Sequence, residues 1–255
     1  MGYNTHSLFG FEISSTGLSA DIEYAWTNYI RKGRGCTYMA CANPHSLVTT
    51  KHDSEFRYAL RNADILLPDG AGIVIAAKLL GKGIKERVTG SDFFIEFTKR
   101  ANKVGGLRYF FLGSNYNVLT KIKNRIDNEY PNVDVCGYYS PPYKETFTQE
   151  EEDKMIAVIN ASKADVLWVG MTAPKQEKWI YRNRERLDVS LACAIGAVFD
   201  FYAGTQKRAP AWLCDIGLEW LYRLCKEPIR LWRRNFISTP VFLFWILRER
   251  ITSYF

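Results

Sequence analysis

The sequence is poor in the residues that build metal sites and disulfide frameworks. It has six cysteines and three histidines, and no two cysteines form a Cys-x-x-Cys pair. This spacing argues against a zinc site, and unpaired thiols suit a reducing compartment. We therefore expect a cytoplasmic protein that holds no metal.

Long apolar runs are missing as well. The longest purely apolar run covers residues 241–247, far short of the roughly 20 residues that cross a bilayer. Residues 1–13 lack the charged start and the continuous apolar stretch of a secretory signal. The sequence therefore predicts neither a transmembrane helix nor export.

The chain is rich in apolar residues and in positive charge. Hydrophobic residues make up 47% of the 255 positions, which is enough for one large core and argues against disorder. Lys and Arg outnumber Asp and Glu by 34 to 27. This excess favours a partner that carries phosphates: a nucleic acid, a nucleotide sugar or an anionic membrane surface. Charge alone leaves these three open.

Apolar, β-prone runs alternate with helical patterns through most of the chain. Strands are predicted near 8–13, 36–42, 65–67, 107–112, 133–138, 166–169 and 190–195, and helices near 19–32, 44–62, 71–80, 91–103, 115–129, 148–162 and 175–186. Several strand runs are apolar without alternation, as in buried parallel strands. The predicted fold class is α/β: a Rossmann-like, mainly parallel sheet with helices on both faces.

The character of the chain changes after about residue 211. No strand pattern follows, and tryptophans are interleaved with arginines, while Pro228 and Pro240 divide the region into about three short helices. We therefore expect an α/β core over residues 1–211 and a helical appendage over residues 212–255.

Asp69 is the first candidate functional residue. It stands in the turn Pro68-Asp69-Gly70, between a predicted strand and an apolar helix. In an α/β sheet, ligands bind beyond the carboxyl ends of the strands, where helix N-termini offer N–H groups. The turn by itself favours a structural interpretation, in which Asp69 caps the helix. A chemical role is the alternative.

Other polar groups follow predicted strands and belong at the same edge of the sheet. They are Asn43 and Gly113 after the second and fourth strands, Gln176 and Glu177 in the first turn of the helix after Pro174, Arg87 before a helix that Ser91 is expected to cap, and Asp200 in an aromatic run expected to bury it. A buried acid must be paired or hydrogen-bonded. Each signal is weak alone, because ordinary caps, turns and surface cations give the same pattern.

Four stretches in a fixed order carry a resemblance to a known family. They are PDGAG (68–72), ERVTGSD (86–92), GMTAPKQE (170–177) and GAVFDFYAGTQKRAPAW (196–212). Together they resemble the WecG/TagA/CpsF family of bacterial glycosyltransferases, glycosyltransferase family 26, from about residue 8 to residue 234. The last stretch is the most specific, because generic α/β patterning would rarely produce it. The resemblance favours the chemical role of Asp69.

The resemblance implies a reaction and a location. Family members transfer a sugar from a UDP-sugar to a polyprenyl-diphosphate-linked saccharide, with inversion at the anomeric carbon. They act at the cytoplasmic face of the bacterial inner membrane, in cell-surface polysaccharide synthesis. The implied protein is thus a peripheral membrane enzyme whose donor sugar is N-acetylmannosamine, its uronic acid or a hexose.

The resemblance also assigns roles to residues. It makes Asp69 the general base on the acceptor hydroxyl and puts Asn43, Arg87, Gln176 and Asp200 on positions that line the nucleotide-sugar pocket. To these positions the strand-end pattern adds Gly113 and Glu177 as expected substrate contacts. No Asp-x-Asp tripeptide, with which many sugar transferases hold a metal, occurs in the chain. We therefore expect no cofactor, with arginines and helix N-termini stabilising the leaving diphosphate.

Two positions depart from the family pattern. Cys41 stands where related enzymes often have Thr, so a hydroxyl donor is replaced by a weak thiol. His45 stands where an acid or a small residue is common. Both departures leave the identity of the donor sugar open.

The appendage is expected to meet the lipid. The resemblance implicates Arg223, Arg230 and Arg233 in binding the lipid diphosphate, and their spacing puts them on one face if the helix bends little at Pro228. Tryptophans beside arginines also suit an anionic membrane surface. The alternative is an amphipathic helix that packs on the core. The apolar tail further predicts some self-association off the membrane.

Two rival functions remain to be weighed. A non-enzymatic protein that binds nucleic acid or an anionic lipid surface would leave Asp69 and Asp200 without a purpose, so we expect no nucleic-acid partner. A dinucleotide-dependent oxidoreductase is weaker still, because no predicted strand is followed by G-x-G-x-x-G.

Overall fold

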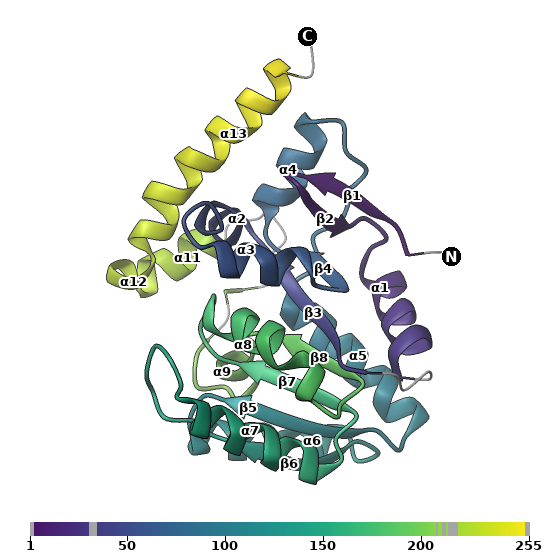
Figure 1. The fold of residues 1–255 in the computed structure, drawn as a ribbon. Helices are drawn as coiled ribbons and strands as arrows, with labels where there is room; N and C mark the ends of the chain where they lie inside the picture. The colour runs from purple at the N-terminus through teal and green to yellow at the C-terminus, as the bar shows by residue number, and fades with distance from the viewer. Residues whose placement is uncertain (1–2, 31–34, 208, 211–212, 214–218, 253–255) are drawn as a thin grey trace.

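A six-stranded parallel sheet forms the centre of the fold (Figure 1). The computed structural model describes residues 3–30, 35–207, 209–210, 213 and 219–252. The strands lie in the order β4 (Ile65–Pro68), β3 (Thr37–Ala42), β8 (Leu191–Ala194), β7 (Val166–Gly170), β5 (Arg108–Gly113) and β6 (Asp134–Tyr139). Each neighbouring pair is parallel. The α/β prediction is confirmed.

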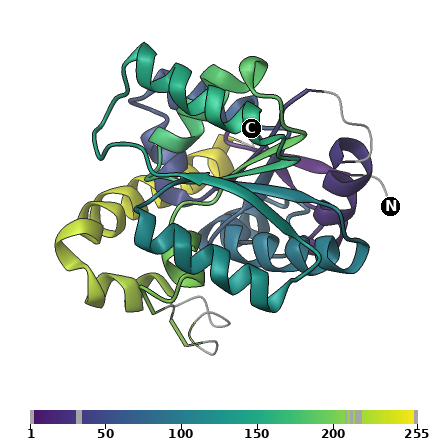
Figure 2. The ribbon, with the colours of Figure 1, turned by 90° about the horizontal axis from the view of Figure 1, so that it is seen from below.

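Helices cover both faces of this sheet, as Figure 2 shows from below. One face packs against α2 (Pro44–Thr49), α3 (Ser54–Arg61), α4 (Ala71–Leu79), α7 (Gln149–Ser162) and α8 (Lys175–Asn183). The other packs against α1 (Leu18–Ala25), α5 (Gly90–Val104), α6 (Tyr116–Glu129) and α9 (Val198–Tyr202). Two separate apolar clusters result. Burial on both sides explains why the strands are continuously apolar.

Three local predictions are wrong, each for a backbone reason. The strand expected near 8–13 is an antiparallel hairpin of β1 (Thr5–Leu8) and β2 (Phe11–Ser14), because Phe9 and Gly10 both adopt positive φ, as tight hairpin turns require. The helix expected over 44–62 is two helices, because Asp53 accepts from the Phe56 N–H and begins α3. The cap of α5 is Thr89 instead of Ser91, in a reciprocal box with Asp92.

The C-terminal region is helical, as expected. It contains α11 (Glu219–Lys226), α12 (Pro228–Arg233), a π-helical segment η3 (Arg234–Ser238) and α13 (Thr239–Thr252). The premise of a helix that bends little at Pro228 is wrong, because α11 ends at Lys226 and Pro228 begins a new helix. Among the described helices, none is long and apolar enough to cross a bilayer.

Helix α13 packs against the core beside α2 (Figure 1). Its Phe242 and Ile246 are buried in the apolar cluster of that face, and the Phe9 ring lies 5.4 Å from Phe242 and 5.7 Å from Trp245. The expected boundary at 211/212, like Arg208 and Trp212 of the last motif, lies outside the described residues. The division into two domains stays a prediction.

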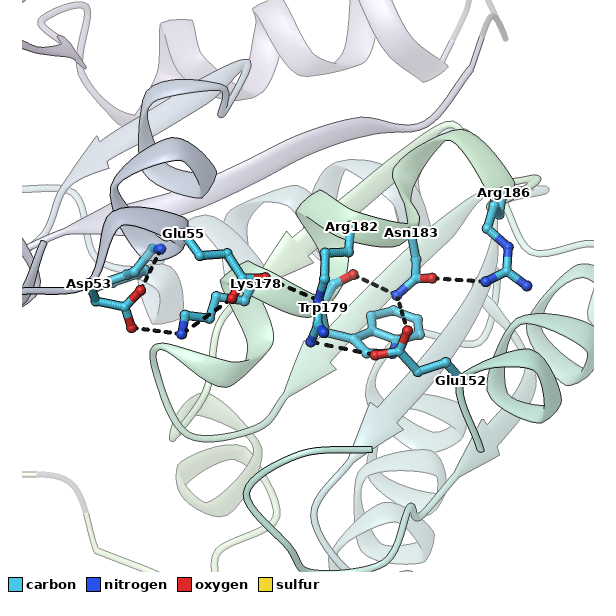
Figure 3. A network of polar contacts seen from close by, with 9 residues as sticks. Asp53, Glu55, Glu152, Lys178, Trp179, Arg182, Asn183 and Arg186 are labelled. Carbon is cyan, nitrogen blue, oxygen red and sulfur yellow. Dashed lines mark hydrogen bonds and ion pairs between the residues drawn. The ribbon is translucent and has the colours of Figure 1, made fainter. Parts of the chain in front are cut away.

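A polar network fixes α8 to its neighbours (Figure 3). Lys178 Nζ lies 2.7 Å from Asp53 Oδ2 and 3.5 Å from Glu55 Oε2, both on α3 or its cap. Arg182 bridges Glu55 of α3 and Glu152 of α7, at 3.2 and 3.4 Å. The network thereby holds the helix whose first turn carries Gln176 and Glu177.

Asp53 both caps α3 and pairs with Lys178, and two variants separate these roles. Asp53→Asn keeps a capping oxygen and removes the ion pair, so we expect a loss of less than about 1 kcal/mol for this partly exposed pair. Asp53→Ala removes both, and we expect it to lose about 1 kcal/mol more. Urea denaturation measures both losses. Equal stabilities for the two variants would contradict the cap.

Candidate active site

Asp69 and Asn43 are brought together by the pairing of β3 with β4. Ala42 and Pro68 are partners in the parallel register, and the Asp69 N–H donates to the Ala42 carbonyl at 2.8 Å. Because Asn43 directly follows Ala42, the two polar residues leave neighbouring strands at the same level. A Cβ built on Gly70 would lie 4.0 Å from Asn43 Cβ, so the two turns are in contact.

The structural interpretation of Asp69 is not supported. The N-cap of α4 is Gly70, whose φ is +97°, a conformation that glycine adopts readily. The N-cap position is therefore taken by Gly70 and not by Asp69. Asp69 itself is partly exposed. A chemical role for Asp69 stays a prediction.

Arg87 belongs to a segment that lies along the end of β4. The Val88 N–H donates to the Pro68 carbonyl at 3.0 Å, which puts Arg87 next to the Asp69 turn and two residues before Thr89, the cap of α5. Gly90 then begins α5, and a Cβ there would lie 3.4 Å from Cys41 Sγ and 3.5 Å from Ile195 Cγ2. The N-terminus of α5 thus meets the ends of β3 and β8.

Asn43 is committed in part to local structure. Its Oδ1 accepts from the Ser46 N–H at 3.0 Å, while its own N–H donates to Ser46 Oγ at 2.8 Å. This capping box begins α2 at Pro44. The capping role is confirmed, and an amide contact to a ligand stays a prediction.

Gln176 and Glu177 are both buried in the first turn of α8. Their exposed fractions are 4% and 3%. Gln176 Nε2 donates to Glu177 Oε1 at 2.8 Å, whereas Gln176 Oε1 and Glu177 Oε2 have no hydrogen-bond partner among the described residues. A Cβ built on Gly196, in the turn after β8, would lie 3.5 Å from both ends of the Gln176 amide. This turn therefore sits against the amide.

Glu177 and Cys41 share an unusual electrostatic environment. Burial raises the pKa of Glu177 to about 7, although hydrogen bonds from the Gln176 amide and from its own backbone N–H offset part of the rise. The pKa of the Cys41 thiol is raised well above its usual range, first by burial and then by the charges of Asp69 and Glu177. Both carboxyl groups therefore act on one thiol at this edge of the sheet.

Residues from separate sequence motifs thus lie together at the carboxyl ends of the strands. Comparison with known proteins shows to which family the chain belongs. The model of the "Glycosyl transferase WecG/TagA/CpsF family" matches residues 6–255. The chain belongs to this glycosyltransferase family. The resemblance stated from the motifs is thus confirmed, and so is the expectation of an enzyme. The non-enzymatic alternative is rejected.

Named relatives match this glycosyltransferase over most of its length. A protein of Bacillus subtilis strain 168, named N-acetylglucosaminyldiphosphoundecaprenol N-acetyl-beta-D-mannosaminyltransferase, is 31% identical over 245 residues, which is 96% of this chain and 92% of the relative. Proteins of the same name from Bacillus spizizenii strain W23 and Staphylococcus aureus strain MW2 are 30% and 24% identical. They cover 92% and 95% of this chain, and 88% and 92% of the relatives.

Asp200 of the glycosyltransferase is not buried as expected. Asp200 is partly exposed, because its neighbours Phe199 and Tyr202 fill the core in its place. Its Oδ1 accepts from Thr205 Oγ1 at 3.1 Å. The prediction of a buried acid is wrong, while a ligand contact by Asp200 stays a prediction.

Gly113 has a packing reason to be glycine. Its φ is +116°, and a Cβ there would lie 2.5 Å from the Gly170 carbonyl oxygen of β7. It also ends β5, and three strands lie between β5 and β4 in the sheet. The four strand-to-strand steps of about 4.8 Å each separate the two strands by roughly 19 Å. The fold does not bring Gly113 to Asp69, and its contact with substrate stays a prediction.

The appendage touches the glycosyltransferase core close to Asn43. His45 Nδ1 lies 2.8 Å from Ser238 Oγ, which joins α2 to η3. Arg223 lies on α11, and Arg230 and Arg233 lie on α12. Their side chains are outside the described part of the structure, so their binding of a lipid diphosphate stays a prediction.

Sequence reasoning missed the contribution of Gly196. Its φ of +54° favours glycine, and the turn that it forms lies against the Gln176 amide and the Met171 carbonyl. The signal was available, because Gly196 directly follows a predicted strand. Within the described ranges, no three His, Cys, Asp or Glu side chains gather closely enough to hold a metal ion.

The raised pKa of Glu177 predicts a pH-dependent stability. Its ordinary value is 4.5 and its folded value is about 7, so the stability that protonated Glu177 contributes is full below about pH 4.5 and is lost as pH rises through about 7. Glu177→Gln removes this titration. Relative to the wild type, we expect the variant to gain about 1 to 3 kcal/mol over that range, measured by urea denaturation. Parallel pH curves for the two proteins would show that Glu177 does not titrate there.

Proposed function

We propose that this glycosyltransferase moves N-acetylmannosamine from a UDP-sugar to N-acetylglucosamine carried on undecaprenyl diphosphate, with Asp69 as the general base. The names of the Bacillus and Staphylococcus relatives state this transferred sugar and this acceptor, and the match extends over nearly the whole chain. In this chain the proposal rests on one observation, the grouping of Asp69, Asn43 and Arg87 at the carboxyl edge of β3 and β4. It narrows the choice of donor sugars that the sequence left open.

The partly exposed Asp69 suits the proton transfer. The acceptor hydroxyl gives its proton to the Asp69 carboxylate while its oxygen forms a bond to the anomeric carbon. On the opposite face of that carbon, the bond to the UDP oxygen breaks and the electron pair leaves with UDP. This single displacement inverts the configuration at the anomeric carbon. A positioned base accelerates such a step by about 10² to 10⁴.

Positive charge beside Asp69 suits the departing diphosphate. Arg87 precedes α5, a helix of 15 residues whose N-terminus carries partial positive charge. Guanidinium groups bind phosphate oxygens in a bidentate manner, so Arg87 and this helix end stabilise the charge as it develops. The absence of Asp-x-Asp from the sequence supports a mechanism without a divalent metal.

The α13 apolar stripe supports a peripheral position at the cytoplasmic face of the inner membrane. This stripe consists of Leu243, Phe244, Leu247 and Ile251, which are 51 to 62% exposed, on a helix whose Phe242 and Ile246 are buried in the core. A lipid-linked acceptor requires the enzyme to approach a bilayer, and exposed apolar residues beside arginines bind interfaces. The stripe, together with Arg223, Arg230 and Arg233, is our proposed membrane and acceptor face.

Replacement of the proposed base tests the reaction. Asp69→Asn is expected to fold and to bind UDP like the wild type, and to lose about 10² to 10⁴ in turnover with a UDP-sugar and lipid-diphosphate-linked N-acetylglucosamine. Release of UDP gives the rate, and isothermal titration gives the affinity. Asp188→Asn, at an exposed carboxylate at the opposite end of the sheet, is the matched control. Unchanged turnover in Asp69→Asn would remove Asp69 as the base.

Replacement within the α13 apolar stripe tests the membrane face. The double variant Leu243→Ser/Leu247→Ser is expected to bind anionic vesicles about tenfold more weakly, because two partly inserted leucines are lost. Val104→Ser/Val158→Ser removes two exposed apolar side chains elsewhere and is expected to bind normally. Vesicle co-sedimentation measures both. If only self-association changes, as read by light scattering, the stripe joins copies of the protein instead of meeting lipid.

A further inference from the structure

We infer that Glu177 is a positioning residue for donor recognition: it holds the Gln176 amide by its nitrogen and thereby offers Gln176 Oε1 as an acceptor to an N–H or O–H of the donor sugar. The inference deepens the proposed function and rests on it. Glu177 would act through Gln176 and would not touch the reacting atoms.

The hydrogen bond between the two residues fixes the orientation of the amide. Because Nε2 donates to Glu177 Oε1 at 2.8 Å, the amide presents its oxygen on the other side. Gln176 Oε1 lacks a hydrogen-bond donor among the described residues, and the residue is 4% exposed. Leaving a buried acceptor without a donor costs free energy. A ligand that brings a donor to this oxygen recovers that cost.

The position of the pair points to the sugar of the donor instead of its nucleotide. A Cβ on Gly90, at the start of α5, would lie 3.4 Å from Cys41 Sγ and 3.5 Å from Ile195 Cγ2, and the next residue, Gly196, lies against the Gln176 amide. The pair therefore lies at the end of the sheet that carries the proposed base. The base meets the hydroxyl that attacks the anomeric carbon, and groups near it therefore surround the sugar. The hydroxyls and the acetamido N–H of an N-acetylated hexose are the donors that Gln176 Oε1 needs.

Ionisation of Glu177 adds a readout that a purely structural role lacks. As a carboxylate, Glu177 forms a charge-assisted bond to the amide, and protonation weakens that bond. The pKa of Glu177 is about 7, so its charge changes near neutral pH. Elements packed against α8 carry other ionisable groups. Tyr38 and Cys41 of β3 and Cys193 of β8 have pKa values raised well above their usual ranges, mainly by burial, and stay neutral there.

The acidic groups that face α8 from its other neighbours are paired with basic residues of α8 itself. Asp53 and Glu55, from α3 and its cap, lie against Lys178, and Glu152 of α7 lies against Arg182. Asp69 lies at the end of β4 and adds its own pH dependence to turnover as a general base. The test therefore follows binding in place of turnover.

The experiment compares UDP with UDP-N-acetylmannosamine as ligands in calorimetry. Glu177→Leu, which cannot hold the amide, is expected to bind UDP like the wild type and to bind the UDP-sugar about tenfold more weakly or worse. Glu177→Gln keeps a neutral acceptor and is expected to fall between them. As pH drops through about 7, affinity for the UDP-sugar is expected to fall in the wild type and to stay level in Glu177→Gln.

Glu152→Gln is the matched control, because Glu152 is also buried on the α8 network but contacts Arg182 and Asn183 at the end of α8, away from its first turn. It is expected to change stability without changing UDP-sugar affinity. Wild-type affinity for the UDP-sugar in a folded Glu177→Leu, or an equal loss for UDP and UDP-sugar, would overturn the inference. If the wild type binds the UDP-sugar but transfers nothing to the lipid-linked acceptor, the proposed function fails while the role of Glu177 is still decided by the binding series.

Discussion

The pairing of β3 with β4 is the constraint on which the site depends. Both strands end at the same level, and the Asp69 N–H closes the ladder on the Ala42 carbonyl. A shift of this register by one residue would turn Asp69 and Asn43 to opposite faces. Both strands are buried on both faces, so the slip would also move their side chains out of the close-packed positions that they fill. The positions of Asp69 and Asn43 are thus determined by the packing of the strands that precede them.

The other part of the candidate site, Gln176 and Glu177, comes from helix α8. Its first turn buries an amide and a carboxyl group side by side, a costly arrangement that burial alone would not favour. The ion pairs and hydrogen bonds of Lys178, Arg182 and Asn183 hold the rest of the helix to α3 and α7. A helix anchored along its length can carry an incompletely hydrogen-bonded polar pair at its start, and such groups are common where proteins meet ligands.

The sequence predicted the sheet well because burial on both faces leaves continuous apolar runs that few other structures share. It failed where backbone conformation decides. The run from Leu8 to Ile13 hides a turn because Phe9, an apolar residue, adopts positive φ. The 44–62 pattern hides a break, because the apolar spacing continues across the Asp53 cap. Asp200 was expected in the core because a short helix such as α9 leaves too few residues to show which face is buried.

The candidate site was predictable as a set of positions but not as a set of contacts. Motif order brought Asp69, Arg87 and Gln176 to notice, and the parallel topology explains why the first two meet. The bond between Gln176 and Glu177 lies beyond sequence patterns, because adjacent helical residues ordinarily point apart. It forms here because both side chains are buried at a helix start, where each must find a polar partner.

Helix α2 links the two parts of the molecule that the proposed reaction needs. Asn43 caps its first turn, His45 contacts Ser238 of η3 at 2.8 Å, and α13 packs along its side. At six residues, α2 is too short for its ends to move independently in a close-packed interior. The turn that holds Asn43 beside Asp69 is therefore one short helix away from η3 and α13, which both contact α2. The Asn43 turn and the apolar stripe thus lie on elements that pack together, although Asn43 and Leu243 are 200 positions apart in the chain.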